Sequence, residues 1–180
     1  MRWTVHGERR VYDSPWVALS LVDVEIPGER RRFEHHVVRY PAAAVGAVVV
    51  RPEDSAVLLL WRHRFITDTW GWEVPAGRVE AGETPEQAAE RETLEETGWR
   101  SGPMRRRASY HPSSGSADLT FHIAAAESAE YVGEPTDAFE AARVEWVALE
   151  TVRELVLAGQ VHNGLSYTAL LHVLAFGPHA

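Results

Sequence analysis

The sequence predicts an α/β fold in which helices cover a mixed β-sheet. Three observations carry this prediction: short segments with strand patterns occupy most of the chain, one strongly capped helix lies in the middle, and two helical segments close it. With 180 residues, 45% of them hydrophobic and 24% charged, the chain is long enough for one compact domain with a core. We find no repeat, low-complexity tract or linker, and we therefore predict a single domain over residues 1–180.

The N-terminal part, residues 1–40, is expected to add antiparallel strands to this sheet protein. Residues 22–26 alternate between aliphatic and acidic side chains, which is the period of a half-buried strand. Gly28 marks a turn, and residues 33–40 are expected to form the return strand. The arginine-rich stretch 29–32 suggests nucleic-acid binding, but an exposed, solvated turn is the favoured interpretation.

The central sheet is expected to begin with a hairpin. Residues 43–50 and 56–61 are apolar runs, and the turn-forming residues 51–55 between them predict a tight connection. Residues 72–74 are typical of a short strand, which Pro75 ends. Later strands are expected near residues 104–109, 118–124 and 144–147.

The clearest helix follows the short strand. Thr84 and Gln87 form a capping box, Pro85 stands at the first helical position, and Gly98 lies just beyond the last turn. Two further helices are expected over residues 149–158 and 165–174, with Gly159 capping the first.

Composition excludes several classes of function. The chain has no cysteine, so disulfides, thiolate catalysis and cysteine-ligated zinc are ruled out. Its net charge of −8 disfavours nucleic-acid binding and would repel a phosphorylated ligand unless cations reverse the local field. No apolar run reaches the ~18–20 residues that cross a bilayer, and residues 1–6 lack the apolar block of a signal peptide. We therefore expect a cytoplasmic protein with no membrane partner.

Three glutamates on the capped helix suggest metal chemistry. Glu92 and Glu96 are i,i+4 neighbours on the helix, and Glu95 lies beside them. Two carboxylates ~5 Å apart repel each other by roughly 3 kcal/mol at an effective dielectric of ~20. Mg²⁺ or Mn²⁺, which prefer oxygen ligands, would relieve this repulsion. Ala88 and Ala89 on the same face are expected to leave its surface bare. The alternative is a solvated acidic face on which Arg91 pairs with Glu95.

The segment before the helix favours the metal interpretation. Gly77, five residues, Glu83 and seven residues precede Arg91-Glu92-Thr93-Leu94-Glu95-Glu96-Thr97-Gly98-Trp99. This stretch, residues 77–99, resembles the Nudix box, with each fixed glycine, glutamate and arginine at the family's spacing. Thr93 and Trp99 replace aliphatic residues of the motif, and both are packing positions.

The resemblance implies an α/β/α sandwich and assigns roles within the site. Glu92 and Glu96 would be the main metal ligands, with the carbonyl of Ala76 and the carboxylate of Glu95 as further ligands. Arg91 would orient the glutamates. Gly77 and Gly82 would let the loop approach metals and phosphates closely.

Outside the box, residues 10–175 resemble the ADP-ribose pyrophosphatase branch. Residues 72–77 are similar to its Trp-Glu-Leu-Pro-Ala-Gly, and residues 61–64 to its Arg-Gln-Tyr-Arg, of which Arg64 keeps the final arginine. The resemblance, together with arginine's fit to a diphosphate, suggests a set of substrate-binding residues. They are Arg62, Arg64, Arg78, Ser113 and Gly115. The alternative for Arg62 and Arg64 is a pair of surface charges, and Ser114 departs from the proline of the branch.

The general base is expected in the loop before the last strand. The branch often has two acidic residues there, separated by one position, and we align Ala138 and Glu140 with them. Glu140 would be either a metal ligand or the base that takes a proton from the attacking water. Asp137 is the nearest substitute, although a surface role suits it better.

The implied reaction is hydrolysis of ADP-ribose to AMP and ribose 5-phosphate. Another nucleotide sugar such as GDP-mannose is the alternative substrate, and a non-catalytic nucleotide-sugar sensor is the alternative of another class. A homodimer is implied as well, since N-terminal strands of the branch commonly cross to a partner and residues 16–40 offer a hairpin with apolar faces. Trp16 and Phe33 are candidates to stack on a nucleobase, with core packing the favoured alternative.

Overall fold

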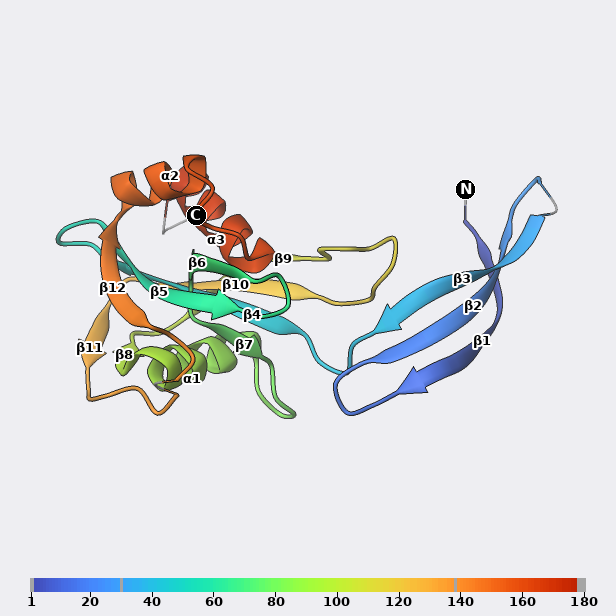
Figure 1. Cartoon of the computed structure of the whole chain (residues 1–180), viewed down its shortest axis with the longest axis horizontal. Helices are drawn as coiled ribbons and strands as arrows, with labels where there is room; N and C mark the ends of the chain where they lie inside the picture. Colours follow the sequence, from blue (N-terminus) through green and yellow to red (C-terminus); the bar gives the residue numbers. More distant parts are fainter. Residues whose placement is uncertain (1, 30, 138, 178–180) are drawn as a thin grey trace. The chain divides into compact units, whose positions relative to one another are not determined.

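The computed structural model describes residues 2–29, 31–137 and 139–177, and it divides into two compact units. The first unit contains residues 1–43 and 111–120, and the second contains residues 44–110 and 121–180. Figure 1 shows the elements of each unit, and each unit is described by itself. None of the helices in the described ranges is long and apolar enough to span a membrane.

The first unit is built on an antiparallel sheet with the order β1-β2-β3. Its strands are β1 (Thr4–Asp13), β2 (Ala18–Ile26) and β3 (Arg31–Arg39). The predicted alternation holds in β2, where every second residue from Ala18 to Val24 is buried. Gly28 adopts a left-handed φ of 87° in the turn, which confirms the turn prediction. Glu29, Arg31 and Arg32 are exposed, and Arg32 pairs with Asp23, so these residues are solvated, as favoured; Arg30 lies outside the described residues.

The second unit holds a seven-stranded mixed sheet in which β10 runs parallel to β4. The main order is β12-β5-β4-β10-β9, β6 pairs with β5, and β7 pairs with β4. The strands and helices have the following bounds: β4 (Ala44–Arg51), β5 (Ala56–Arg64), β6 (Thr69–Glu73), β7 (Ala76–Arg78), α1 (Pro85–Thr97), β8 (Trp99–Ser101), β9 (Arg105–Tyr110), β10 (Phe121–Ala126), β11 (Ala129–Tyr131), β12 (Arg143–Ala148), α2 (Leu149–Leu157) and α3 (Gly164–Phe176). Strands β8 and β11 form a separate two-stranded ladder.

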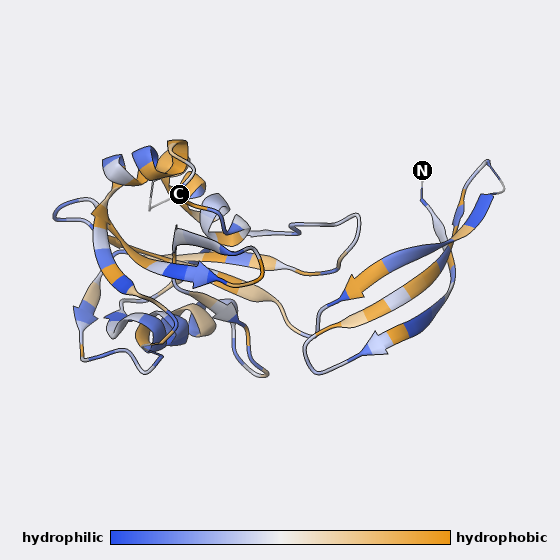
Figure 2. Cartoon of the chain, viewed as in Figure 1, coloured by the Kyte–Doolittle hydropathy of each residue, from blue (hydrophilic) through white to orange (hydrophobic). Residues whose placement is uncertain are grey.

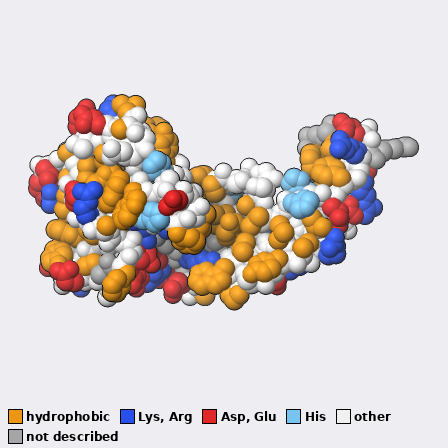
Figure 3. Space-filling view, in the orientation of Figure 1, with side chains coloured by type: hydrophobic (Ala, Val, Ile, Leu, Met, Phe, Trp, Pro, Cys, Tyr) orange, Lys and Arg blue, Asp and Glu red, His pale blue; other side chains and the backbone are white. Residues whose placement is uncertain are grey.

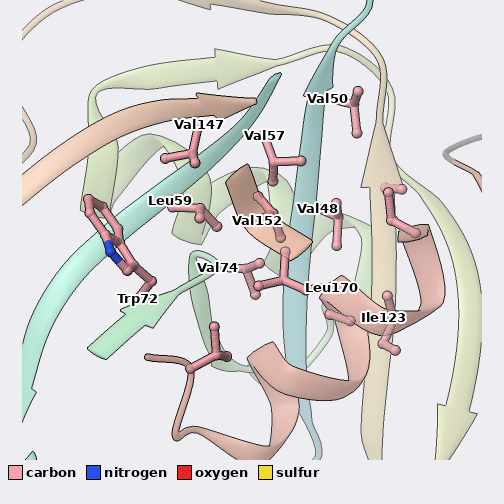
Figure 4. Packing of buried hydrophobic residues seen from close by; sticks show 14 of the residues in the cluster. Val48, Val50, Val57, Leu59, Trp72, Val74, Ile123, Val147, Val152 and Leu170 are labelled. Atoms are coloured by element: carbon pink, nitrogen blue, oxygen red, sulfur yellow. The ribbon is translucent and has the colours of Figure 1, made fainter. Parts of the chain in front are cut away.

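Two hydrophobic clusters cover the two faces of this sheet. Val48 and Val50 of β4 face one cluster, which includes Val152 of α2 and Leu170 of α3 (Figure 4). The opposite cluster contains Ala47 and Val49 of β4 together with the alanines of α1. Alternate residues of one strand therefore face helices on opposite sides, which confirms the α/β/α sandwich.

The box helix has the predicted ends. The Thr84 hydroxyl accepts a hydrogen bond from the Gln87 backbone, and the Gln87 side chain accepts one from the Thr84 backbone. Gly98 closes the helix with a φ of 73° and donates its N–H to the Leu94 carbonyl. Figure 2 shows that α1 carries many hydrophilic residues, because only one of its faces is covered.

Candidate active site

The inward face of α1 brings the box glutamates to the sheet. Ala88, Ala89 and Thr93 are fully buried against β4 and β10. Our expectation that the two alanines leave a bare surface is wrong: their small side chains let α1 lie close to the sheet, so that face is core. Thr93 donates its hydroxyl to the Ala89 carbonyl at 2.7 Å, which explains how a polar residue fills an aliphatic place of the box.

Glu96 is the most deeply buried carboxylate of the site, with 3% of its surface exposed. It accepts hydrogen bonds from the Arg62 guanidinium at 2.7 Å and from the Ala76 backbone N–H at 2.9 Å. Burial nevertheless raises the pKa of Glu96 to about 7, because the loss of hydration outweighs the attraction of Arg62. More positive charge is needed here to keep the carboxylate ionised near neutral pH.

Arg91 ties the loop before the helix to the helix itself. Its guanidinium donates to Glu83 at 2.8 Å, to Glu92 at 2.7 Å and to Glu95 at 2.9 Å, and also to the Arg78 carbonyl at 3.0 Å. Arg91 therefore contacts the box glutamates as the resemblance implies. The ion pair between Arg91 and Glu95, which we gave as the alternative, is one of these contacts. The structure adds a role for Glu83 that we had not assigned, because the Glu83 carboxylate anchors Arg91. The fixed position of Glu83 in the box could have indicated this role from the sequence.

Arg62 joins two carboxylates from distant parts of the chain. Its guanidinium contacts Glu96 on α1 and Glu140 in the loop before β12. Because only 5% of Arg62 is exposed, its interpretation as a surface charge is wrong. The loop is fixed on both sides of Glu140: the Asp137 N–H donates to the Glu95 carbonyl at 3.0 Å, and the Ala142 N–H to the Trp61 carbonyl at 2.8 Å. Ala138, which we aligned with the first acidic residue of the branch, lies outside the described residues.

The remaining predicted substrate residues are distributed over both units. Arg64 pairs with the buried Glu73 at 2.6 Å, and its own side chain is partly exposed. Ser113 and Gly115 belong to the first unit, where the Gly115 carbonyl contacts His35 at 2.8 Å. A role of Ser113 and Gly115 in substrate binding therefore stays a prediction.

The aromatic candidates differ from each other. Trp16 is 66% exposed, so the core packing that we favoured for it is wrong. Phe33 is partly buried and packs edge-on against Trp3, with ring centroids 5.9 Å apart.

Gly77 allows β7 to approach the carboxylates. A Cβ placed on Gly77 would overlap the carboxylate of Glu92, so no other residue fits without moving that side chain. Gly82 serves the loop differently, since its φ of 90° lies in the left-handed region.

Gly77→Ala is expected to push Glu92 out of place and to lower kcat by about 10²-fold, which is the cost of a misplacement of ~1 Å in an active site. The rate is to be compared with that of Gly164→Ala, where a Cβ would meet nothing within 4 Å. Activity of Gly77→Ala equal to that of the control would show that the position of Glu92 is unimportant.

The four carboxylates of Glu92, Glu95, Glu96 and Glu140, here called the carboxylate cluster, suit a hard divalent cation. Within the described part of the chain, no three acidic or histidine side chains converge as they stand on a common metal position. Their oxygens instead contact Arg62 and Arg91. The donor chemistry still fits, since the ligands are all oxygen, the buried Glu96 needs added positive charge, and Gly77 leaves room beside Glu92.

Comparison with known proteins identifies the family. The NUDIX domain family matches residues 40–167. A protein of Streptomyces rubellomurinus (strain ATCC 31215), named CMP-5'-(N-acetyl-N-hydroxy-3-aminopropyl)phosphonate hydrolase, is 42% identical over 177 residues, which cover 98% of this chain and 84% of the relative. The ADP-ribose pyrophosphatase of Bacillus subtilis (strain 168) is 27% identical over 169 residues, 93% of this chain and 90% of the relative.

A solved structure shows the same fold. The crystal structure of an ADP compounds hydrolase matches with a TM-score of 0.84 and 18% identity, covering 97% of this chain and 93% of that one. The grouping of residues 1–180 into one domain stays a prediction, because the family match covers residues 40–167 only. The family match covers most of the chain, and the capped box helix and the mixed sheet between helices are consistent with it. The protein therefore belongs to the Nudix hydrolases.

Proposed function

We propose that this enzyme hydrolyses the phosphoanhydride bond between a nucleoside monophosphate and a second phosphorus-containing group, with divalent cations held by the carboxylate cluster. The observation that carries the proposal is the carboxylate cluster itself: Arg62 holds Glu96 and Glu140, and Arg91 holds Glu92 and Glu95. Family members generally use divalent metal ions, and the choice between Mg²⁺ and Mn²⁺ is part of the proposal.

Two substrates fit this description. ADP-ribose is our first expectation, supported by the Bacillus subtilis relative. A cytidylyl-linked phosphonate is supported by the Streptomyces relative, which is more similar over almost the whole chain. Both compounds have an anhydride oxygen between two phosphorus atoms, so the same carboxylate cluster serves either, and the difference must lie in the residues that contact the base and the second group.

The proposal assigns the following roles to the residues of the site. Glu92, Glu95, Glu96 and the Ala76 carbonyl would hold the cation, which supplies positive charge against the anhydride and makes water more acidic. Glu140 accepts a proton from the attacking water, whose oxygen bonds to one phosphorus while the anhydride bond to that phosphorus breaks. Arg91 holds Glu92 and Glu95 in place, while Arg64 and Arg78 bind the phosphate oxygens.

The test is a substrate screen with Mg²⁺ and with Mn²⁺, in which products are identified by mass. ADP-ribose, a CMP-linked phosphonate and GDP-mannose are compared by kcat/KM. Release of a nucleoside monophosphate from at least one of them is the expected result. Tight binding without turnover would contradict the proposal and would favour the alternative of a non-catalytic sensor.

We also propose that a second copy of this chain covers the N-terminal sheet. All residues of β1 are exposed, and Trp3, Val5 and Tyr12 are about half exposed or more. Hydrophobic side chains are visible on this unit in Figure 3. Exposed apolar patches of this kind mark interaction sites, and an uncovered edge strand favours pairing. Light scattering at micromolar concentration is expected to give a dimer, and a monomer would count against the proposal.

A further inference from the structure

Arg62 has an unusual position for an arginine. It is 5% exposed, lies on strand β5, and its guanidinium contacts the carboxylates of both Glu96 and Glu140, which are 44 positions apart in the sequence. A buried charge persists only where it is paired, and here both partners belong to the carboxylate cluster. The positive charge of Arg62 therefore acts on the carboxylates of the site and is not a surface charge.

The charge balance of the cluster depends strongly on this residue. The four carboxylates form the ion pairs described above with Arg62 and Arg91, so the loss of Arg62 would remove the positive charge that contacts Glu96 and Glu140. Arg91 is also shared with Glu83, whereas both contacts of Arg62 described above are within the cluster. A fixed positive charge beside a cation site repels the cation, and the repulsion is strong where water is excluded.

We infer that Arg62 sets the cation affinity of the carboxylate cluster and positions Glu140, because its guanidinium is the counter-ion that Glu96 and Glu140 share. The inference rests on the proposed function and deepens it. Two consequences follow: removing the charge should strengthen cation binding, and removing the bridge should loosen Glu140. The second effect acts through Glu140, so Arg62 is a positioning residue.

The first experiment measures Mn²⁺ binding to the full chain from the electron paramagnetic resonance signal of free Mn²⁺. Arg62→Gln is expected to lower the Kd for Mn²⁺ by about tenfold or more, since a fixed charge near the cation is gone. Arg62→Lys keeps the charge and should bind Mn²⁺ within about threefold of the unmodified chain. Arg51→Gln is the matched control, because Arg51 forms an exposed pair with Asp54 in the β4–β5 turn; it should change nothing.

The outcomes separate the possibilities. Unchanged or weaker Mn²⁺ binding by Arg62→Gln overturns the inference, and so does equal tightening in Arg62→Lys. If neither the unmodified chain nor Arg62→Gln binds Mn²⁺, the cation site of the proposed function fails and the inference fails with it. Should Arg62→Gln not fold, Arg62→Lys decides: a Kd within threefold and a lowered kcat support the inference, and a larger change in Kd contradicts it.

The positioning role is tested by combining variants. Arg62→Gln alone is expected to lower kcat at saturating Mn²⁺ by about tenfold or more. In the Glu140→Gln background the same change should cost no more than about threefold, because the carboxylate that Arg62 positions is already absent. An equal loss of kcat in both backgrounds would overturn the positioning role.

Discussion

Glu96→Gln is expected to lower kcat by about two or more decades while the fold survives. Glu96 is the buried centre of the carboxylate cluster, and the loss of a metal ligand removes several kcal/mol of transition-state charge stabilisation. Glutamine has the same shape and can still accept the hydrogen bond from the Ala76 N–H, so the capped helix should keep its place.

The measurement is kcat at saturating substrate and cation, with circular dichroism to confirm folding. Glu90→Gln is the matched control, because Glu90 is an exposed residue of α1 whose carboxylate accepts from the Met104 N–H, a bond that an amide oxygen can replace. A Glu96→Gln enzyme as active as Glu90→Gln would remove Glu96 from the chemistry.

Glu140→Gln is expected to produce the second largest loss, about 10²–10⁴-fold in kcat, if Glu140 is the general base. We propose Glu140 rather than Asp137 because the Glu140 carboxylate contacts Arg62, which also holds Glu96. In this case the cation concentration that gives the half-maximal rate should be nearly unchanged.

A metal ligand at position 140 would behave differently. The half-maximal cation concentration would then rise, and added Mg²⁺ or Mn²⁺ would recover much of the rate. Asp137→Asn is the control and is expected to be mild. If Glu140→Gln matches the unmodified enzyme in both respects, our alignment of this loop is wrong, and Glu95 or the loop 113–118 becomes the next candidate for the base.

The sequence was informative where structure is determined locally. The ends of α1 were predictable because a capping box, a proline and a glycine satisfy the helix termini within a few residues. The β4–β5 hairpin was predictable for the same reason, since turn-forming residues separate two apolar runs. Strand β1 was not assigned, because its alternation is irregular; its pairing with β2 shifts register at two places.

Contacts between distant residues were not predictable. Arg62 and Glu140 are 78 positions apart, and nothing in their neighbourhoods specifies that the two side chains meet. The burial of Ala88 and Ala89 was missed for a related reason: a helical face with alanines and glutamates fits both a bare surface and a close approach to a sheet. Packing decides between these two arrangements, and the strand that α1 packs against, β4, lies far earlier in the chain.

The most direct test of the central claim is hydrolysis of ADP-ribose and of a CMP-linked phosphonate before and after chelation. For whichever compound is hydrolysed, we expect the rate to vanish with excess chelator and to return when Mg²⁺ or Mn²⁺ is added. The reason is that the carboxylate cluster and the net charge of −8 repel a diphosphate unless cations are present. Undiminished release of the nucleoside monophosphate after thorough chelation would contradict the account.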